Sequence, residues 1–337
     1  MKPLVSILIP AYNAAPWIAE TIQSALAQTW PRREIIVVDD GSKDATVTVA
    51  RQFASKEVSV VPQENQGAAA ARNKAASLCQ GDYIQWLDAD DLLGPDKIAA
   101  QMEFAERVAN PRILYSSGWG YFFKRARKAK FTPTALWADL TPVEWLRQKM
   151  AHGYHMQTAT WLVSRELTTA AGPWNTGLAS DDDGEYFCRV LLASERIVFV
   201  PKSKVYYRRS SASQLSYLGQ SQRKLEPLWS SMRLHVQYLR SLDDSESARA
   251  ICLKYLHLWA VFFYPDRMDL VKRVENLAAE LGGTLSPPEL SWKYIWLEKL
   301  LGWKMTRQIQ MRYNLKKSAL LQSYDALMYR FEKGNKL

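Results

Sequence analysis

Apolar runs alternate with helical patterns along the first third of the chain. The apolar runs are nearly continuous, as in strands buried on both faces, and cover residues 4–10, 34–40, 58–61 and 83–87. The stretches between them place apolar side chains three or four positions apart, and cover residues 16–28, 44–53 and 66–78. Strands that alternate with helices in this way predict an α/β fold with a doubly wound, mostly parallel sheet.

The alternation becomes less regular after residue 96. We expect a helix over 96–109, a strand over 113–123 that bends at its glycines, and further strands over 157–163 and 197–201. From residue 213 onward, long helical patterns rich in Leu, Trp and basic residues follow, with a break at 282–288. The pattern therefore predicts a domain over residues 1–212 and a helical region over residues 213–337.

Composition indicates a globular protein. Hydrophobic residues make up 47% of the 337 positions, enough for sizeable cores. The three cysteines, Cys79, Cys188 and Cys252, lack the spacing of a zinc site or a disulfide framework, which fits a reducing compartment. The chain starts directly on a strand pattern without a signal peptide, and its longest apolar run, 255–264, is too short to span a bilayer. We therefore expect a cytoplasmic location.

The charge is positive and unevenly distributed. The net charge is +10, and residues 213–337 contain 19 Lys and Arg against 12 Asp and Glu. A basic surface favours anionic partners, namely nucleic acid, phosphorylated substrates or an anionic membrane face. Because no zinc-finger, helix-turn-helix or RNP-like pattern accompanies the charge, nucleic acid is not expected as a partner.

Three carboxylates follow the apolar run 83–87. Asp88 and Asp90 lie two positions apart, so an extended chain would present them on one face, where a divalent cation would relieve their repulsion. This arrangement favours a site for Mg²⁺ or Mn²⁺ and a diphosphate. The alternative is a turn in which Asp91 caps the next helix. An EF-hand is excluded because Leu93 and Ala99 stand where it needs Gly and Glu.

A nucleotide bound at this edge of the sheet would need that cation. The expected strand ends bring Tyr12, Asp39, Asp40, Asp88 and Asp90 to one edge, where doubly wound sheets bind ligands. No Gly-x-Gly-x-x-Gly follows the first strand, and no Gly-Lys-Ser/Thr occurs. The phosphates therefore lack the usual glycine-rich cradle, and a carboxylate-bound metal would neutralise them instead.

Four segments in register resemble a known family. Residues 6–13, 36–42, 65–73 and 88–91 match, in order and spacing, the inverting family 2 glycosyltransferases of the GT-A fold, and the resemblance covers roughly residues 3–209. It implies a nucleoside-diphosphate sugar donor, with a UDP-sugar favoured, and Mn²⁺ or Mg²⁺ as cofactor. For the nucleoside, the resemblance implies that Pro10 and Tyr12 line the base and ribose pocket and that Asp39 accepts a hydrogen bond from a uracil-like base. It also implies that Arg72 helps to bind the nucleotide and that Asp88 faces the ribose. Of the last two acids, Asp90 would bind the metal, and Asp91 would assist the metal or cap a helix.

A second acidic cluster lies at residues 181–183. In the resembled family an acidic pair precedes an Arg by six positions, so counting back from Arg189 assigns the catalytic base to Asp183 and its neighbour to Asp182. Asp181 and Asp182 are the alternatives, because three consecutive Asp residues leave the register open. Gly184 stands where the family has a bulky residue. A structural alternative for the whole cluster is an acidic helix N-terminus.

The chemistry explains why a second acid is needed. Inverting transfer is one in-line displacement, in which a base takes the acceptor hydroxyl proton while the metal stabilises the leaving diphosphate. The pair Arg208 and Arg209, after the last strand, is expected to contact the diphosphate. Of the remaining polar motifs, the basic run 124–130 is either a solvated loop or a phosphate contact. His152 and His155 are not expected to share a metal, because their rings would face opposite ways on an extended segment.

The helical region offers a candidate membrane contact. Trp292, Trp296 and Trp303 interleave with lysines in a basic amphipathic pattern, which suits either a membrane interface or packing against the catalytic domain or another subunit. A membrane surface would make the acceptor a lipid-linked sugar or a growing glycan.

Two rival functions were weighed against sugar transfer. A nucleotidyltransferase needs a glycine-rich basic loop after the first strand, whereas residues 11–15 read Ala-Tyr-Asn-Ala-Ala. A non-catalytic nucleotide-binding or scaffold protein would not need the acids at 39, 88, 90 and 183.

Overall fold

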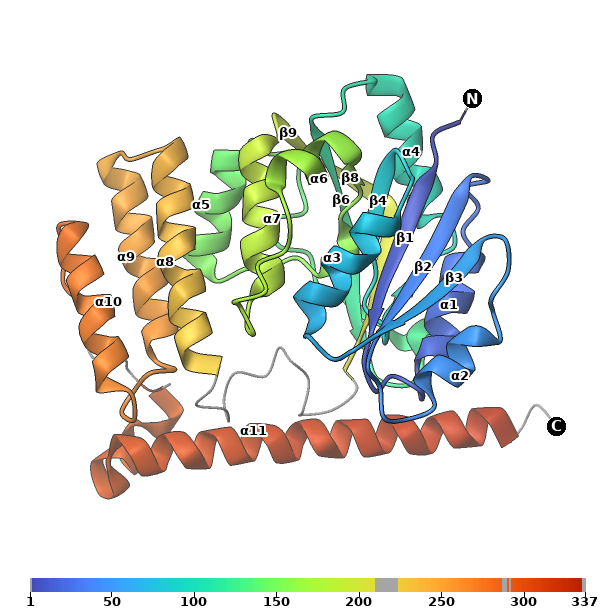
Figure 1. Cartoon of the computed structure of the whole chain (residues 1–337). Coiled ribbons are helices and arrows are strands. Elements are labelled where there is room, and N and C mark those ends of the chain that lie inside the picture. The colour runs from blue at the N-terminus through green and yellow to red at the C-terminus, as the bar shows by residue number, and fades with distance from the viewer. Residues whose placement is uncertain (1, 210–223, 287–289, 291, 335–337) are drawn as a thin grey trace.

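The computed structural model describes residues 2–209, 224–286, 290 and 292–334 (Figure 1). The predicted boundary between residues 212 and 213 lies outside these residues. The α/β class is confirmed, with two sheets flanked by helices and a helical C-terminal region.

The first sheet has the strand order β3-β2-β1-β4-β8. Its four parallel strands correspond to the four predicted apolar runs, and every residue of β1 is buried, as expected for a central strand covered on both faces. The edge strand β8 is antiparallel to β4. The bounds are β1 Val5–Ala11, β2 Arg33–Asp40, β3 Val58–Gln63, β4 Tyr83–Trp86 and β8 Val163–Ser164.

The helices between these strands bury small or apolar residues against the sheet. The alanine-rich α3 packs on β1 and β2 through Ala71 and Ala75, and Figure 1 shows it in front of the sheet. The predicted helices are confirmed with shorter bounds, α1 Ile18–Leu26, α2 Thr46–Arg51, α3 Ala68–Leu78 and α4 Lys97–Val108.

The second sheet has the order β5-β9-β6-β7, with β9 parallel to β6. At the first of the glycines where a bend is expected in β6, the pairing shifts register between Ser117 and Gly118, because residues 201–203 of β9 are passed over. The last strand runs further than the predicted 197–201. The bounds are β5 Leu92–Leu93, β6 Ile113–Phe122, the 3₁₀ turn η1 Ala126–Lys128, β7 Lys130–Phe131 and β9 Arg196–Arg208.

The predicted strand over 157–163 is wrong for most of its length, and only its last residue, Val163, lies in a strand, β8. This segment forms the 3₁₀ turn η2 (Thr158–Thr160), in which the Thr160 amide and hydroxyl both donate to the Gln157 carbonyl. Local side-chain bonds to the backbone favour turns over ladders, which overrides the strand preference of this threonine-rich segment. Along the chain, helix α5 (Pro142–His152) precedes this turn, and helices α6 (Arg165–Ala171) and α7 (Asp182–Ala193) follow it.

The C-terminal helices α8, α9 and α10 share one hydrophobic core with the sheets. Helix α8 packs on α7, and α9 packs on α5, with Met232 and Leu256 fully buried. A long last helix, α11, is interrupted at Gly302. None of the helices in the described ranges combines the length and apolar character that crossing a bilayer requires. The bounds are α8 Leu225–Leu242, α9 Glu246–Ala260, α10 Met268–Glu280, the 3₁₀ turn η5 Trp292–Tyr294 and α11 Ile295–Gly334.

Candidate active site

The carboxyl ends of β1 and β2 place three predicted nucleotide contacts at one edge. Pro10 is buried in β1, Ala11 pairs with Asp39 of β2, and the Tyr12 side chain just beyond is 49% exposed. Asp39 is buried, and its Oδ2 accepts the Ser42 amide at 3.0 Å. Its Oδ1 is also buried but has no hydrogen-bond partner among the described residues. This orphaned acceptor matches the expected contact with an imide N–H.

Asp40 has a different role from its neighbour. Its carboxylate accepts the backbone amides of Gln66 and Gly67 at 2.9 and 2.8 Å, and also two side-chain amides. These bonds fix the turn that enters α3, so Asp40 shapes the loop and does not point at a ligand.

Arg72 on α3 joins the two acidic clusters. Its guanidinium donates to Asp88 Oδ1 at 2.8 Å and to Asp182 Oδ2 at 2.7 Å, and it lies over the Trp174 ring at 4.4 Å. Burial by itself would lower the pKa of Arg72, but the charges of Asp182 and Asp88 raise it above its usual value. Arg72 therefore stays charged and holds Asp88 and Asp182 in one site.

Asp91 anchors the loop that follows β4. This carboxylate is fully buried, and it accepts the Arg208 backbone amide at 2.8 Å and the Gln157 side-chain amide. Burial and the neighbouring Asp90 and Asp88 raise its pKa well above the usual value. The alternative in which Asp91 caps the next helix is wrong, because α4 begins at Lys97 with Asp96 at its N-cap.

Asp88 and Asp90 lie in the same loop as Asp91 and, unlike it, are both partly exposed. Within the described ranges, no three His, Cys, Asp or Glu side chains converge in the manner of a closed metal site. Mg²⁺ and Mn²⁺ are hard cations, and Mg²⁺ in particular is bound through one or two carboxylates, water and substrate phosphates. The donor set at 88 and 90 therefore fits such a cation.

Arg208 and Arg209 are placed differently from each other. The Arg208 guanidinium is buried, donates to the Asp90 carbonyl at 2.7 Å and to Glu20 at 2.6 Å, and lies over the Trp17 ring. Arg209 is exposed, with its guanidinium over the Tyr121 ring. Arg208 thus supports the loop that carries Asp90, while the diphosphate contact of either arginine stays a prediction.

The second acidic cluster opens α7. Asp182 and Asp183 lie in the first turn, and Asp183 Oδ2 accepts the Thr158 hydroxyl at 3.2 Å. Gln157, the residue before Thr158, binds Asp91, so two consecutive residues of the turn at η2 connect the two clusters. Burial raises the pKa of Asp182 to about 6, against the opposing effect of Arg72 and with help from Asp183 and Asp88.

Asp181 has its hydrogen-bond partner on a different element, α8. Its backbone is left-handed, with φ of 56°, and its carboxylate accepts the Ser231 hydroxyl of α8 and lies 3.7 Å from His235 Nε2. A Cβ on Gly184 would lie 2.1 Å from Asp181 Oδ1. The glycine at this position therefore leaves room for Asp181 to reach α8. Burial lowers the pKa of His235 to about 3, so this histidine is neutral.

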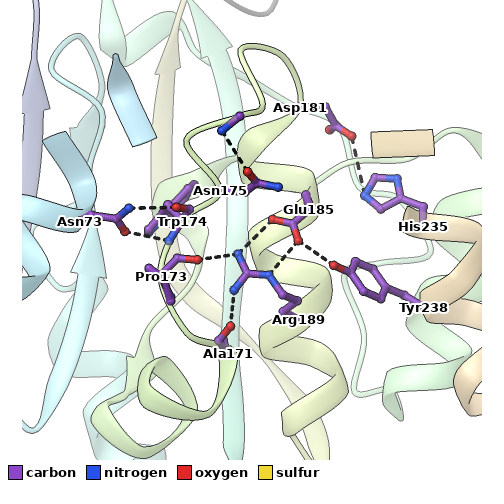
Figure 2. A network of polar contacts seen from close by, with 11 residues as sticks. Asn73, Ala171, Pro173, Trp174, Asn175, Asp181, Glu185, Arg189, His235 and Tyr238 are labelled. Atoms are coloured by element: carbon purple, nitrogen blue, oxygen red, sulfur yellow. Dashed lines mark hydrogen bonds and ion pairs between the residues drawn. The ribbon is translucent and has the colours of Figure 1, made fainter. Parts of the chain in front are cut away.

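Sequence reasoning missed the network behind the cluster (Figure 2). Arg189 donates to the backbone carbonyls of Ala171 and Pro173 and to Glu185, which also accepts the Tyr238 hydroxyl at 2.7 Å. These bonds hold the loop that leads into α7. The spacing of Arg189 to the acids, which matches the resembled family, is its one sequence signal, whereas nothing in the sequence around Tyr238 marks it.

A small cavity of about 30 Å³ adjoins Asp183. Lys149 and His155 line it together with Asp181, and burial followed by the Lys149 charge lowers the pKa of His155. His155 packs on Trp119, whereas His152 ends α5 and stacks on Tyr154, so the expectation that both histidines lie on an extended segment is wrong. A wider hollow of about 810 Å³, between the first residues of the chain and α4, contains none of the predicted site residues and carries no argument for function.

Comparison with known sequences gives a consistent assignment. The family model "Glycosyl transferase family 2" matches residues 6–166. An uncharacterized glycosyltransferase of Rickettsia typhi is 32% identical over 277 residues, covering 78% of this chain and 80% of the relative. TuaG of Bacillus subtilis, provisionally named a teichuronic acid biosynthesis glycosyltransferase, is 45% identical over 106 residues, 31% of this chain and 42% of TuaG.

Solved structures share the fold. Staphylococcus aureus TarS 1–349, crystallised in complex with UDP-GlcNAc, matches with a TM-score of 0.66 at 17% identity, over 82% of this chain and 80% of that one. The mannosyltransferase PcManGT of Pyrobaculum calidifontis, in complex with GDP-Man and Mn²⁺, matches with a TM-score of 0.54 at 20% identity, over 96% and 88% of the two chains.

Proposed function

The chain belongs to the family 2 glycosyltransferases, and from this premise we propose that it is an inverting, divalent-cation-dependent enzyme. The donor is a nucleoside-diphosphate sugar, a UDP-sugar before others, and the acceptor is a hydroxyl of a glycan or a lipid-linked sugar. The observation that carries this proposal is the Arg72 bridge, because it brings the acid expected to face the donor, Asp88, to the acids expected to act on the acceptor.

The donor site is supported by the edge of the first sheet. The orphaned Asp39 Oδ1 suits the N3–H of a uracil, and the exposed Tyr12 ring beside it suits stacking or ribose contact. Pro10 closes the same pocket from β1. TarS was crystallised with UDP and with UDP-GlcNAc, which favours the same class of donor here.

Asp90, aided by Asp88, is proposed to hold Mn²⁺ or Mg²⁺. Bound there, the cation would neutralise the diphosphate as a Lewis acid and favour its departure. The role of Asp91 is to fix the loop beneath, since both of its oxygens already accept hydrogen bonds. The presence of Mn²⁺ with PcManGT agrees with a divalent cation in this fold.

Asp183 is the proposed base. It takes the proton of the acceptor hydroxyl while that oxygen bonds to the anomeric carbon and the bond to the diphosphate breaks. The Thr158 hydroxyl donates to its carboxylate, and we assign the small cavity beside it to the acceptor side. Asp182 is tied to Arg72 and Asp181 to α8, which favours Asp183 among the three.

The acceptor class is proposed from one relative. TuaG, which is 45% identical to this chain over 106 residues, is named for teichuronic acid biosynthesis. We therefore propose a role in surface polysaccharide or glycolipid synthesis.

A panel of nucleotide sugars tests the donor and metal together. Because a ligand that binds the folded state raises its stability, UDP-sugars with Mn²⁺ are expected to raise the melting temperature by several degrees, and EDTA to remove most of the shift. A Tyr12→Ala variant should lose the shift while keeping the melting temperature of the free protein. Stabilisation by no nucleotide, or by UDP equally with EDTA, would contradict the proposal.

A further inference from the structure

The outward face of α11 carries an apolar stripe along most of the helix. Beyond the break at Gly302, apolar side chains recur every three or four residues on one side, interrupted once by Lys316, with exposed fractions from 38% at Ile309 to 72% at Leu320. We call this set the α11 stripe; it comprises Met305, Ile309, Tyr313, Leu320, Tyr324, Leu327 and Phe331.

The opposite side of α11 is fastened to the rest of the protein. Asp325 accepts the backbone amides of Lys124 and Arg125 and pairs with the Arg125 guanidinium at 2.7 Å. Glu332 also pairs with Arg125, and Gln322 donates to the Arg209 carbonyl. The inward side of α11 thus combines these polar contacts with half-buried apolar residues such as Met311, Leu315 and Met328, whereas the α11 stripe faces outward.

The charges around the α11 stripe are basic. Between residues 292 and 332 the chain has eight Lys and Arg against three Asp and Glu. Two of those three acids, Asp325 and Glu332, are paired with arginines of the loop after β6. Exposed basic residues thus flank an exposed apolar stripe, with little negative charge to offset them; on the helix after Gly302 they include Arg312, Lys316, Lys317 and Arg330.

We propose that the α11 stripe docks the protein on an anionic lipid bilayer, with the helix lying in the interface. An amphipathic helix of this kind buries its apolar face among the acyl chains while its Lys and Arg contact anionic headgroups. A second copy of the chain is a poorer occupant. Lys316 and Arg330 lie within the line of the stripe, so two stripes packed together would bring like charges into contact.

This surface adjoins the proposed active site. Lys124, whose amide bonds to Asp325, places its ammonium over the Trp17 ring at 3.8 Å. The same ring receives Arg208, which donates to the Asp90 carbonyl. Figure 1 shows α11 passing beneath the carboxyl ends of β1 and β2. If the proposed function holds, docking would present the acceptor site to lipid-linked sugars, although the docking itself does not depend on catalysis.

Vesicle sedimentation of the full chain tests the docking. Wild-type protein is expected to bind vesicles of phosphatidylglycerol and phosphatidylcholine, to bind pure phosphatidylcholine far more weakly, and to dissociate progressively as NaCl is raised. Leu320→Glu with Leu327→Glu should weaken binding roughly 100-fold, because two buried apolar side chains are replaced by charges that anionic lipid repels.

The matched control adds the same two charges elsewhere. Asn276→Glu with Ala279→Glu alters exposed positions of α10 and should leave vesicle binding within about threefold of wild type. Circular dichroism must show both double variants folded. Asp183→Asn should bind vesicles normally, so a failure of catalysis and a failure of docking are separate results. Equal vesicle binding by wild type and Leu320→Glu/Leu327→Glu, or a wild-type dimer in solution that this variant dissociates, would overturn the proposal.

Discussion

At the scale of single residues, the site depends on side chains that connect the acids after β4 with the acids at the start of α7. Arg72 pairs with Asp88 and Asp182, which otherwise would repel each other across the site. Asp91 does not cap the next helix, but holds the loop of Asp90 through partners far away in the sequence. The carboxylates could be predicted from the sequence because they end an apolar run. Their partners Gln157 and Arg208 could not, since only tertiary packing brings them there.

Replacing Arg72 should cost both stability and donor binding. Arg72→Gln leaves two partly buried carboxylates without their cation, and we expect the free energy of unfolding to fall by about 2–3 kcal/mol. Urea denaturation measures this loss. Arg196→Gln, which breaks an exposed pair with Asp139, should change stability by less than about 0.5 kcal/mol. Similar costs for the two variants would contradict the bridging role.

Asp182 should make stability depend on pH. Since its folded pKa is raised to about 6, the folded state binds more protons than the unfolded state between about pH 4 and 6. The free energy of unfolding should therefore decrease as pH rises through this window and level off above it. Relative to Asp182→Asn, wild type should lose about 2–3 kcal/mol between pH 4 and pH 7. Parallel pH profiles for the two proteins would refute this assignment.

At the scale of elements, a short irregular segment, the turn at η2, contacts carboxylates that lie at the ends of regular strands and helices. The four parallel strands of the first sheet and the helices between them follow from hydrophobic periodicity, which predicts their bounds to within about two residues, whereas the edge strand β8 does not follow from it. The pattern predicts a strand at η2, because apolar and β-branched residues occur in strands and in turns alike. The hydrogen bonds that decide for the turn are local ones between side chain and backbone. Yet this turn connects Asp91 to Asp183.

Thr158→Val tests whether the turn at η2 orients the base. Valine keeps the volume but removes the hydroxyl that donates to Asp183, so kcat should fall about tenfold with little change in KM for the donor. Thr169→Val on α6 removes a hydroxyl bonded to a helix carbonyl and should leave both constants within about twofold. A change in donor KM alone would assign Thr158 to substrate binding.

At the scale of the whole molecule, the C-terminal helices divide into two groups. Helices α8 to α10 belong to the same core as the sheets, and α8 also contributes Ser231 and Tyr238 to the network around α7. Helix α11 contributes none of its described residues to that core and is fastened through hydrogen bonds and ion pairs to the loop after β6 and to Arg209. The sequence predicted helices here, but periodicity cannot tell which neighbour a helix face will meet.

Two truncations distinguish these groups. A chain ending at residue 286 keeps α8 to α10 and should unfold cooperatively on heating, as followed by circular dichroism. A chain ending at residue 212 loses the helices that cover α5 and α7, which exposes apolar core, and should aggregate or unfold without a cooperative transition. A stable, cooperative 1–212 fragment would show instead that the predicted boundary separates independent domains.

The central claim is that one site has a base at Asp183 and a donor held by the acids of the first sheet and its loop. The most direct test is the transfer rate of Asp183→Asn at saturating UDP-sugar and Mn²⁺, measured beside its affinity for UDP. We predict a rate lowered roughly 10²- to 10⁴-fold with UDP affinity within about threefold of wild type. Turnover at the wild-type rate by this variant would contradict the account.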